Sequence, residues 1–202
     1  MILILDNRDS FTFNLAQALQ GLGVEVRVER STGLSAGDVS RLKPAGVLIG
    51  PGPGRPAAAG CSEDVIRAAA RAETAFPVLG VCLGHQALAT ALGGGLRAAT
   101  TLVHGETQAV THDGTGLFDG LPSPLEIARY NSLTIDEEVL PNDLRIVGRT
   151  GDGDVAAAAH RTEPLFGIQG HPESILCLES GLRILARFLE FTEGRRPARP
   201  RA

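Results

Sequence analysis

The sequence is short of cysteine, of long apolar runs and of positive charge. Its three cysteines are odd in number and far apart in the chain, which argues against a disulfide framework or a metal cluster and favours a reducing cytoplasm. No apolar run approaches the ~20 residues that a membrane-spanning helix needs. The net charge of −4 argues against a nucleic-acid-binding surface. We therefore expect a cytoplasmic protein without membrane or nucleic-acid partners.

The chain has the length and composition of one globular domain. Its 202 residues are 43% hydrophobic and 21% charged, which allows a sizeable core without disulfides. We expect this domain to span residues 1–192. Residues 193–202 contain four arginines and no large apolar side chain. We expect a flexible tail there rather than a nucleic-acid-binding arm, because the rest of the chain is acidic.

The first half of the chain alternates between strand and helix patterns. Continuous apolar runs are typical of strands buried on both faces of a parallel sheet, and apolar residues at helical spacing separate them. Asp9 or Ser10 is expected to cap the first helix. Strands are predicted at residues 1–5, 24–28, 45–49 and 77–79, and helices at 11–22, 62–74 and 86–92.

The second half contains shorter strands and one final helix. Gly151-Asp152-Gly153 is a hairpin signal between two of the strands. We therefore predict an α/β fold, with an open, mostly parallel sheet flanked by helices and a smaller antiparallel strand group in the second half. Strands are predicted within residues 96–110 and at 125–128, 143–148, 155–160 and 165–169. The last helix is expected from about Ser174, with an apolar seam of Ile175, Leu178, Leu182, Leu185 and Leu189.

Cys82 lies in the stretch Gly80-Val81-Cys82-Leu83-Gly84, between a predicted strand and a predicted helix. A nucleophile flanked by glycines at such a turn forms a nucleophile elbow, here with cysteine in place of serine. The helix dipole favours the thiolate, and the amide of Leu83 points toward an oxyanion on an attacked carbonyl. The pentapeptide alone is equally compatible with a buried structural cysteine.

A rigid loop of alternating glycine and proline, residues 50–56, follows the strand at 45–49. In a doubly wound sheet, ligands bind beyond the carboxyl ends of the strands, and both this loop and Cys82 lie at that edge. Gly52 is the candidate for a backbone amide that approaches a ligand closely. An ordinary surface loop is the alternative.

His171-Pro172-Glu173 follows the last predicted strand. A cysteine nucleophile requires a base that takes its proton and returns it to a leaving amine, and histidine titrates in the right range. A carboxylate two residues further on, Glu173, can orient His171. Alone, the tripeptide is also typical of a turn or cap. The other histidines are expected to be structural or solvent-facing, with His85 directed away from Cys82.

Taken together, these motifs resemble the class I glutamine amidotransferases, the glutaminase subunits of anthranilate synthase or aminodeoxychorismate synthase. The likeness extends from residue 1 to about residue 190, and several motifs in the same order are more specific than any one of them. The matching segments are Leu5-Asp6-Asn7, Asp9-Ser10-Phe11-Thr12, Pro51-Gly52-Pro53-Gly54, Gly80 to Gln86, His112-Asp113-Gly114, Leu121-Pro122-Ser123-Pro124, Arg129-Tyr130, Ser132-Leu133 and His171-Pro172-Glu173-Ser174.

The resemblance implies hydrolysis of L-glutamine to glutamate and ammonia. Cys82 would attack the side-chain amide carbonyl, His171 would relay the proton to the departing ammonia, and Glu173 would orient His171. The amides of Gly52 and Leu83 would hold the oxyanion. The glutamine-binding residues implied by the family are Gly52, Gln86, Ser132 and Leu133.

The resemblance also implies a partner, a larger chorismate-binding synthase subunit that uses the ammonia. No cofactor or metal is expected in this chain, and magnesium is expected in the partner. Three positions depart from the family pattern. Asn131 replaces the usual histidine, Gly170 replaces an aromatic residue and can loosen the packing beside His171, and Arg8 replaces a hydrophobic residue. They leave open which amino-chorismate product the partner makes.

Two other functions stay open at this stage. A module of the same fold could bind a partner without turnover, although Cys82, His171 and Glu173 are all present. A cysteine hydrolase on an α/β-hydrolase scaffold could act on esters or lactones. That scaffold places its acid before its histidine in the chain, whereas Glu173 follows His171.

Overall fold

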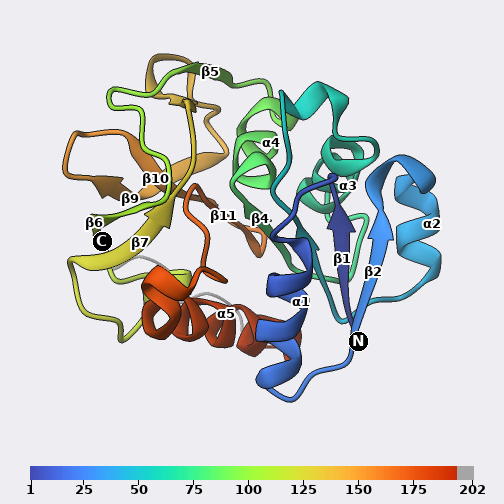
Figure 1. Cartoon of the computed structure of the whole chain (residues 1–202). Coiled ribbons are helices and arrows are strands. Elements are labelled where there is room, and N and C mark those ends of the chain that lie inside the picture. The colour runs from blue at the N-terminus through green and yellow to red at the C-terminus, as the bar shows by residue number, and fades with distance from the viewer. Residues whose placement is uncertain (195–202) are drawn as a thin grey trace.

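The computed structural model describes residues 1–194, which form a mixed sheet with helices on both faces (Figure 1). The strands are β1 (Ile2–Asp6), β2 (Val26–Arg30), β3 (Gly46–Ile49), β4 (Val78–Val81), β5 (Gly95–Ala98), β6 (Glu106–His112), β7 (Leu125–Arg129), β8 (Leu133–Asp136), β9 (Leu144–Thr150), β10 (Val155–His160) and β11 (Leu165–Ile168). The α-helices are α1 (Thr12–Gly21), α2 (Ala36–Arg41), α3 (Ser62–Ala70), α4 (Leu83–Ala91) and α5 (Leu178–Thr192).

One half of the main sheet is parallel. The nine strands follow the order β2-β1-β3-β4-β11-β10-β9-β6-β7, and the first five run in the same direction. Strands β3, β4 and β11 end at nearly the same level, because Ile49 lies opposite Gly80 and Val81 lies opposite Ile168. The loops that follow these three strands therefore meet at one edge of the sheet.

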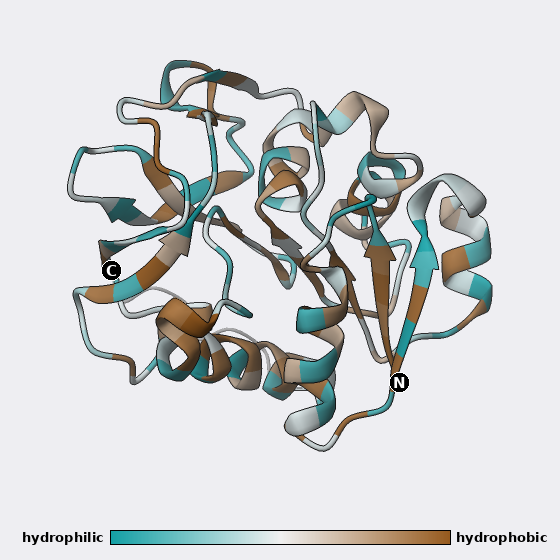
Figure 2. Cartoon of the chain, in the orientation of Figure 1, coloured by the Kyte–Doolittle hydropathy of each residue, from teal (hydrophilic) through white to brown (hydrophobic). Residues whose placement is uncertain are grey.

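Alternation of side chains along the parallel strands creates two cores. Ile2 and Ile4 point to the face covered by α1 and α5, whereas Leu3 and Leu5 point to the face covered by α2, α3 and α4. Both faces of β1 are thus buried, which explains its unbroken apolar run. Figure 2 shows β1 as hydrophobic and the edge strand β2 as more hydrophilic.

The other half of the sheet is antiparallel. Strands β10, β9, β6 and β7 continue the same sheet beyond β11, and β5 pairs with β8 in a small second sheet. The predicted hairpin is confirmed between β9 and β10, where the amide of Gly153 donates to the carbonyl of Thr150 at 2.9 Å. The predicted α/β class and the antiparallel group are both confirmed.

Two predicted helix ends were wrong. Phe11, not Asp9 or Ser10, is the N-cap residue of α1, and no side chain caps that helix. The carboxylate of Asp9 instead accepts a hydrogen bond from the amide of Phe11 at 2.8 Å, which closes a turn just before the helix. Helix α3 ends at Ala70 rather than at residue 74, because Ala72 adopts a positive φ of 54°.

The predicted apolar seam of the last helix was wrong in its first part. Residues Ile175–Cys177 form a 3-10 turn, and α5 begins only at Leu178. Ile175 is therefore 86% exposed and Leu178 is 41% exposed. A Cβ at Gly181 would lie 1.8 Å from the carbonyl oxygen of Pro172, so this glycine fixes which face of the helix is buried. The buried residues of α5 are Gly181, Ile184, Leu185, Phe188 and Leu189.

The domain boundary at residue 192 stays a prediction, although α5 ends there. The predicted tail, apart from Glu193 and Gly194, lies outside the described residues. Within residues 1–194, no helix is both long enough and apolar enough to cross a membrane.

Candidate active site

The candidate site lies where β3, β4 and β11 end side by side. The loop containing Gly52 follows β3, Cys82 follows β4, and His171 follows β11. A backbone hydrogen bond of 2.9 Å from the amide of Cys82 to the carbonyl of Ile168 joins the second and third of these segments. Residues far apart in the sequence are thus brought together by the order of the strands, as the carboxyl-end rule predicts.

Cys82 forms the predicted elbow. Its backbone has φ 52° and ψ −100°, a strained conformation for a residue with a side chain. The flanking glycines are required by close backbone contacts. A Cβ at Gly80 would lie 2.2 Å from the carbonyl oxygen of Gly84, and a Cβ at Gly84 would lie 2.2 Å from that of Ile49. Only glycine at both positions lets α4 start directly above β3 and β4.

Gly52 packs directly against the elbow. A Cβ at Gly52 would lie 2.8 Å from a side-chain methyl of Leu83 and 2.6 Å from the Cβ of Asn7. Asn7 in turn holds this loop, since its side-chain amide donates to the carbonyl of Gly50 at 2.9 Å. The fold therefore places the two residues whose amides are predicted to hold the oxyanion next to each other.

His171 and Glu173 form a buried pair. Nδ1 of His171 lies 2.7 Å from Oε1 of Glu173, and both side chains are almost fully enclosed. Burial alone would lower the pKa of His171, but hydrogen bonds and charge interactions with Cys82 and Glu173 outweigh it and raise that pKa from 6.5 to about 10. Nε2 makes no hydrogen bond of ordinary geometry within residues 1–194, which leaves it for Cys82. The site therefore favours the protonated form of His171.

Aromatic rings hold His171 in place, and the sequence analysis did not assign them this role. Its ring packs edge-on against Tyr130, with centroids 4.9 Å apart, and against Phe11 at 5.5 Å. Gly170 leaves no space for the ring that the family usually has there, since a Cβ would lie 2.5 Å from Ile127. The main chain of His171 instead hydrogen-bonds to β7 through the carbonyl of Ala128 at 2.8 Å. The packing beside His171 is therefore tight, contrary to the expectation from Gly170.

The structure brings together three of the predicted glutamine-binding residues. Nε2 of Gln86 donates to the carbonyl of Leu133 at 3.1 Å. Ser132 is exposed, and its carbonyl accepts a hydrogen bond from the amide of Ala99 at 3.0 Å, which fixes the main chain before β8. Gly52 lies beside Leu83. Their contacts with glutamine stay a prediction.

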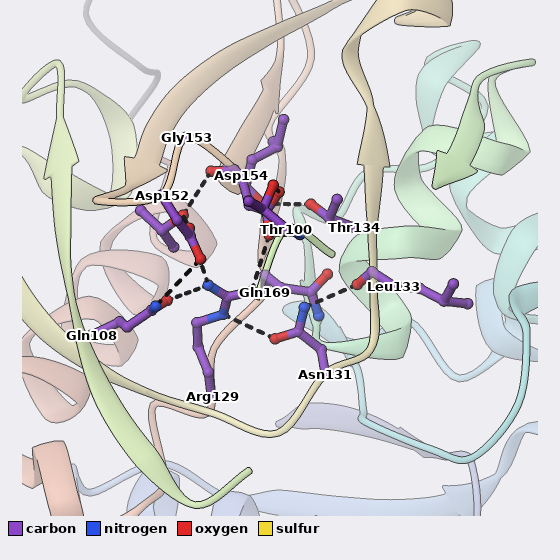
Figure 3. Close-up of polar contacts among 12 residues, drawn as sticks. Thr100, Gln108, Arg129, Asn131, Leu133, Thr134, Asp152, Gly153, Asp154 and Gln169 are labelled. Carbon is purple, nitrogen blue, oxygen red and sulfur yellow. Dashed lines mark hydrogen bonds and ion pairs between the residues drawn. The ribbon is translucent and has the colours of Figure 1, made fainter. Parts of the chain in front are cut away.

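A buried charged network supports the Ser132–Leu133 segment (Figure 3). Arg129, at the end of β7, is 1% exposed and pairs with the equally buried Asp154 at 3.4 Å. Nε of Arg129 donates to Oδ1 of Asn131 at 2.9 Å, and Nδ2 of Asn131 donates to the carbonyl of Leu133 at 2.9 Å. This role of Arg129 and Asn131 was not predicted from the sequence. An arginine three residues before Ser132, one of the predicted substrate-binding residues, was the available signal.

A groove of about 680 Å³ opens on the other side of Glu173, between α1 and the start of α5. It is lined by apolar side chains such as Ile175 and Leu178, and none of the predicted glutamine-binding residues contributes to it. We therefore do not assign glutamine to this groove. Within residues 1–194, no cluster of three or more His, Cys, Asp and Glu side chains is arranged to hold a metal ion.

The fold and the arrangement of Cys82, His171 and Glu173 are those of a doubly wound α/β protein with a candidate cysteine nucleophile. The family model described as glutamine amidotransferase class-I matches residues 3–190. The chain belongs to this family. The family assignment replaces the α/β-hydrolase alternative.

Curated relatives are similar over almost the whole chain. Aminodeoxychorismate synthase component 2 of Escherichia coli is 45% identical over 94% of this chain and 99% of its own length. Anthranilate synthase component 2 of Mycobacterium tuberculosis is 46% identical over 93% of this chain and 81% of its own. The crystal structure of a GMP synthase subunit protein from Thermoplasma acidophilum has a TM-score of 0.80 at 21% identity, covering 95% of this chain and 93% of that chain, and thus shares the fold.

Proposed function

We propose that this chain is a glutaminase subunit that hydrolyses L-glutamine and delivers ammonia to a larger synthase subunit, which aminates chorismate. The observation that carries the proposal is the buried His171–Glu173 pair beside the strained elbow cysteine, Cys82. Membership in the glutamine amidotransferase class-I family supports the reaction. The two relatives named as component 2 of chorismate-pathway synthases support the partner.

In the first half-reaction, the thiolate of Cys82 attacks the side-chain carbonyl carbon of glutamine. The carbonyl π electrons move to oxygen, and the amides of Gly52 and Leu83 donate hydrogen bonds to the resulting oxyanion, each worth about 3 kcal/mol. His171 enters this step protonated, as its raised pKa indicates. It gives its proton to the amide nitrogen, the carbon–nitrogen bond breaks, and ammonia leaves behind a glutamyl thioester on Cys82.

In the second half-reaction, His171 is neutral and takes a proton from water. The hydroxide attacks the thioester carbonyl, the carbon–sulfur bond breaks, and the γ-carboxylic acid that leaves gives up its proton to water, which yields glutamate. Cys82 and His171 return to the thiolate and imidazolium forms. Glu173 keeps the imidazole in one orientation throughout, through the 2.7 Å contact to Nδ1.

Glutamine itself would lie between the elbow and the Ser132–Leu133 segment. Gln86 and the main chain of these two residues would contact it, with Gly52 on the oxyanion side. The proposal includes no cofactor or metal in this chain, magnesium in the synthase partner, a hetero-oligomer, and a cytoplasmic location. The Leu133 carbonyl already accepts hydrogen bonds from Gln86 and Asn131, so this wall of the site is formed before substrate binds.

The test measures glutamate release from glutamine by the purified chain, alone and with a chorismate-utilising synthase subunit. Turnover that increases with the partner and disappears in Cys82→Ala would support the proposal. Cys61→Ala is the matched control, since Cys61 is buried near α3 and lies in another part of the fold. The aromatic product formed from chorismate would then identify the pathway, including a product other than anthranilate or aminodeoxychorismate.

Absence of turnover in well-folded protein, with and without the partner, would contradict the catalytic proposal. If the chain still bound the synthase subunit, it would be a partner-binding module that has lost turnover. Size-exclusion chromatography of the mixture separates these outcomes.

A further inference from the structure

We propose that Gln169 is a further catalytic residue, whose side-chain amide donates a hydrogen bond to the thiolate of Cys82. The inference rests on the proposed function only in taking Cys82 as the nucleophile. Gln169 directly follows β11 and is 1% exposed. Its Nε2 lies 3.6 Å from Sγ of Cys82, within hydrogen-bonding range of a sulfur acceptor.

The position of Gln169 in the chain suits this contact. Gln169 lies in the bend that follows β11, two residues before His171. The main chain of Gln169 is fixed by a hydrogen bond of 2.8 Å from its amide to the carbonyl of Ala156 on β10. One short segment thus supplies two side chains that interact with Cys82, the amide of Gln169 and the imidazole of His171.

The surrounding hydrogen bonds determine which end of the Gln169 amide faces the sulfur. A backbone carbonyl can only accept, so the contact with the Leu133 carbonyl must come from the NH2 group of Gln86. That same NH2 group lies 3.2 Å from Oε1 of Gln169 and donates to it. With its oxygen held in this way, Gln169 presents its own NH2 group to Cys82.

The buried arginine orients the side-chain amide of Asn131 by the same reasoning. A guanidinium can only donate, so Oδ1 of Asn131 must face Arg129 and the NH2 group of Asn131 must face the Leu133 carbonyl. The Leu133 carbonyl therefore receives two donors of fixed direction. A chain of hydrogen bonds with one permitted orientation runs from Arg129 through Asn131, Leu133 and Gln86 to Gln169 and the nucleophile.

Gln169 differs from His171 in that its hydrogen-bond donor is permanent. His171 gives its proton to the leaving nitrogen and later takes another from water, so its own donor changes during the cycle. A neutral amide does not change its protonation state, so Gln169 donates to the thiolate at both ends of the cycle. A hydrogen bond to a charged acceptor is worth about a factor of ten or more in the equilibrium between thiolate and thiol.

The experiment compares Gln169→Glu and Gln169→Leu with the unmodified chain. The glutamate variant has nearly the same shape and can still accept from Gln86, but it brings a carboxylate to the sulfur in place of a donor. Gln20→Glu is the matched control, because Gln20 lies exposed on α1. Melting temperature and circular dichroism establish that each variant is folded.

The main readout is alkylation of Cys82 by iodoacetamide as a function of pH, followed by mass spectrometry of the peptide that contains it. We expect the midpoint of the reactivity curve to move up by about one pH unit in Gln169→Glu, with a smaller upward shift in Gln169→Leu and none in Gln20→Glu. The kcat for glutamine hydrolysis should fall about tenfold in Gln169→Leu with KM changed less than about twofold, since the contact is to the nucleophile rather than to substrate.

Unchanged alkylation midpoints in both folded Gln169 variants would overturn the proposal, whatever their glutaminase activity. Because alkylation does not require glutamine, its outcome is independent of the proposed function. Shifted midpoints in a chain that fails to hydrolyse glutamine would support the Gln169 contact and contradict the proposed function instead.

Discussion

The two halves of the main sheet build the site in different ways. The parallel half, β2-β1-β3-β4-β11, is held by apolar side chains on both faces and carries Gly52, Cys82 and His171 at its edge. The antiparallel half, β10-β9-β6-β7, buries ionised groups, among them Arg129 and Asp154. The first half supplies the reacting groups, and the second orients the wall that faces them.

The two halves of the sheet position their groups by different means. In the parallel half, position is set by close backbone contacts, as at the elbow glycines, where any side chain would overlap a carbonyl oxygen. In the antiparallel half, position is set by the direction of hydrogen bonds, which begin at a guanidinium that can only donate. Substitutions should therefore act sterically in one half and through unpaired polar groups in the other.

The largest effect on stability is expected for Gly84→Ala, which tests whether close backbone contacts set position in the parallel half. The added methyl group would meet the carbonyl oxygen of Ile49 at 2.2 Å, so α4 must move away from β3. We expect a loss of about 3 kcal/mol or more in the free energy of unfolding, measured by urea denaturation. Gly21→Ala, with no atom within 4 Å of the new Cβ, should change it by less than about 1 kcal/mol. Similar values for the two variants would contradict the steric explanation.

Arg129→Met tests whether the buried hydrogen-bond network sets position in the antiparallel half. It removes the donor to Asn131 and one partner of the buried Asp154, which keeps its contact with Arg97 at 2.8 Å. We expect a loss of about 3 kcal/mol, the low end of the range for breaking a buried ion pair, together with a raised KM for glutamine. Arg149→Met, which breaks a partly exposed pair with Glu137, should cost less than about 1 kcal/mol. An unchanged KM in Arg129→Met would show that the network does not position the Leu133 segment.

His85 is a polar group within the apolar half, and it makes stability depend on pH. Full burial lowers the pKa of His85 from 6.5 to about 4, against the opposing effect of the nearby backbone of Val155 and Gly167. The unfolded chain therefore binds a proton between pH 6.5 and 4 that the folded chain does not. The contribution of neutral, buried His85 to the free energy of unfolding is complete above pH 6.5. It is lost as pH falls, by about 2 kcal/mol at pH 5.

The measurement is urea unfolding at pH 7 and pH 5 for the unmodified chain and for His85→Leu. The variant should lose about 2 kcal/mol less between the two pH values, whatever its stability at pH 7. An equal loss in both proteins would show that other groups cause the acid sensitivity.

The smallest effect is expected for Leu178→Ala. This residue belonged to the predicted seam of the last helix but is 41% exposed, so its removal should cost less than about 1 kcal/mol. Leu185→Ala, at a fully buried position of the same helix, should cost about 3 kcal/mol. Thermal unfolding of the two variants compares them directly, and equal costs would mean that the start of α5 is packed against another surface in solution.

The sequence was sufficient to predict the parallel half and its edge. A strand buried on both faces appears as an unbroken apolar run, and glycines around Cys82 mark a backbone that no other residue fits. The helix phase of α5 was mistaken because a 3-10 turn at residues 175–177 delays its start. The pairing of Arg129 with Asp154 joins the end of β7 to the turn between β9 and β10, 25 residues further along the chain, and no local pattern reports such a contact. For the same reason, the contact of Gln169 with Cys82 was not predicted.

The position of β11 has a consequence for how the protein is made. This strand is the last one within residues 1–194 but lies in the middle of the main sheet, between β4 and β10. A growing chain that has emerged only as far as residue 160 contains the cysteine, but it lacks His171, Glu173 and the strand that joins the two halves. Long-range strand pairing of this kind forms late in folding. The nucleophile therefore gains its base only after β11 has joined the two halves of the sheet.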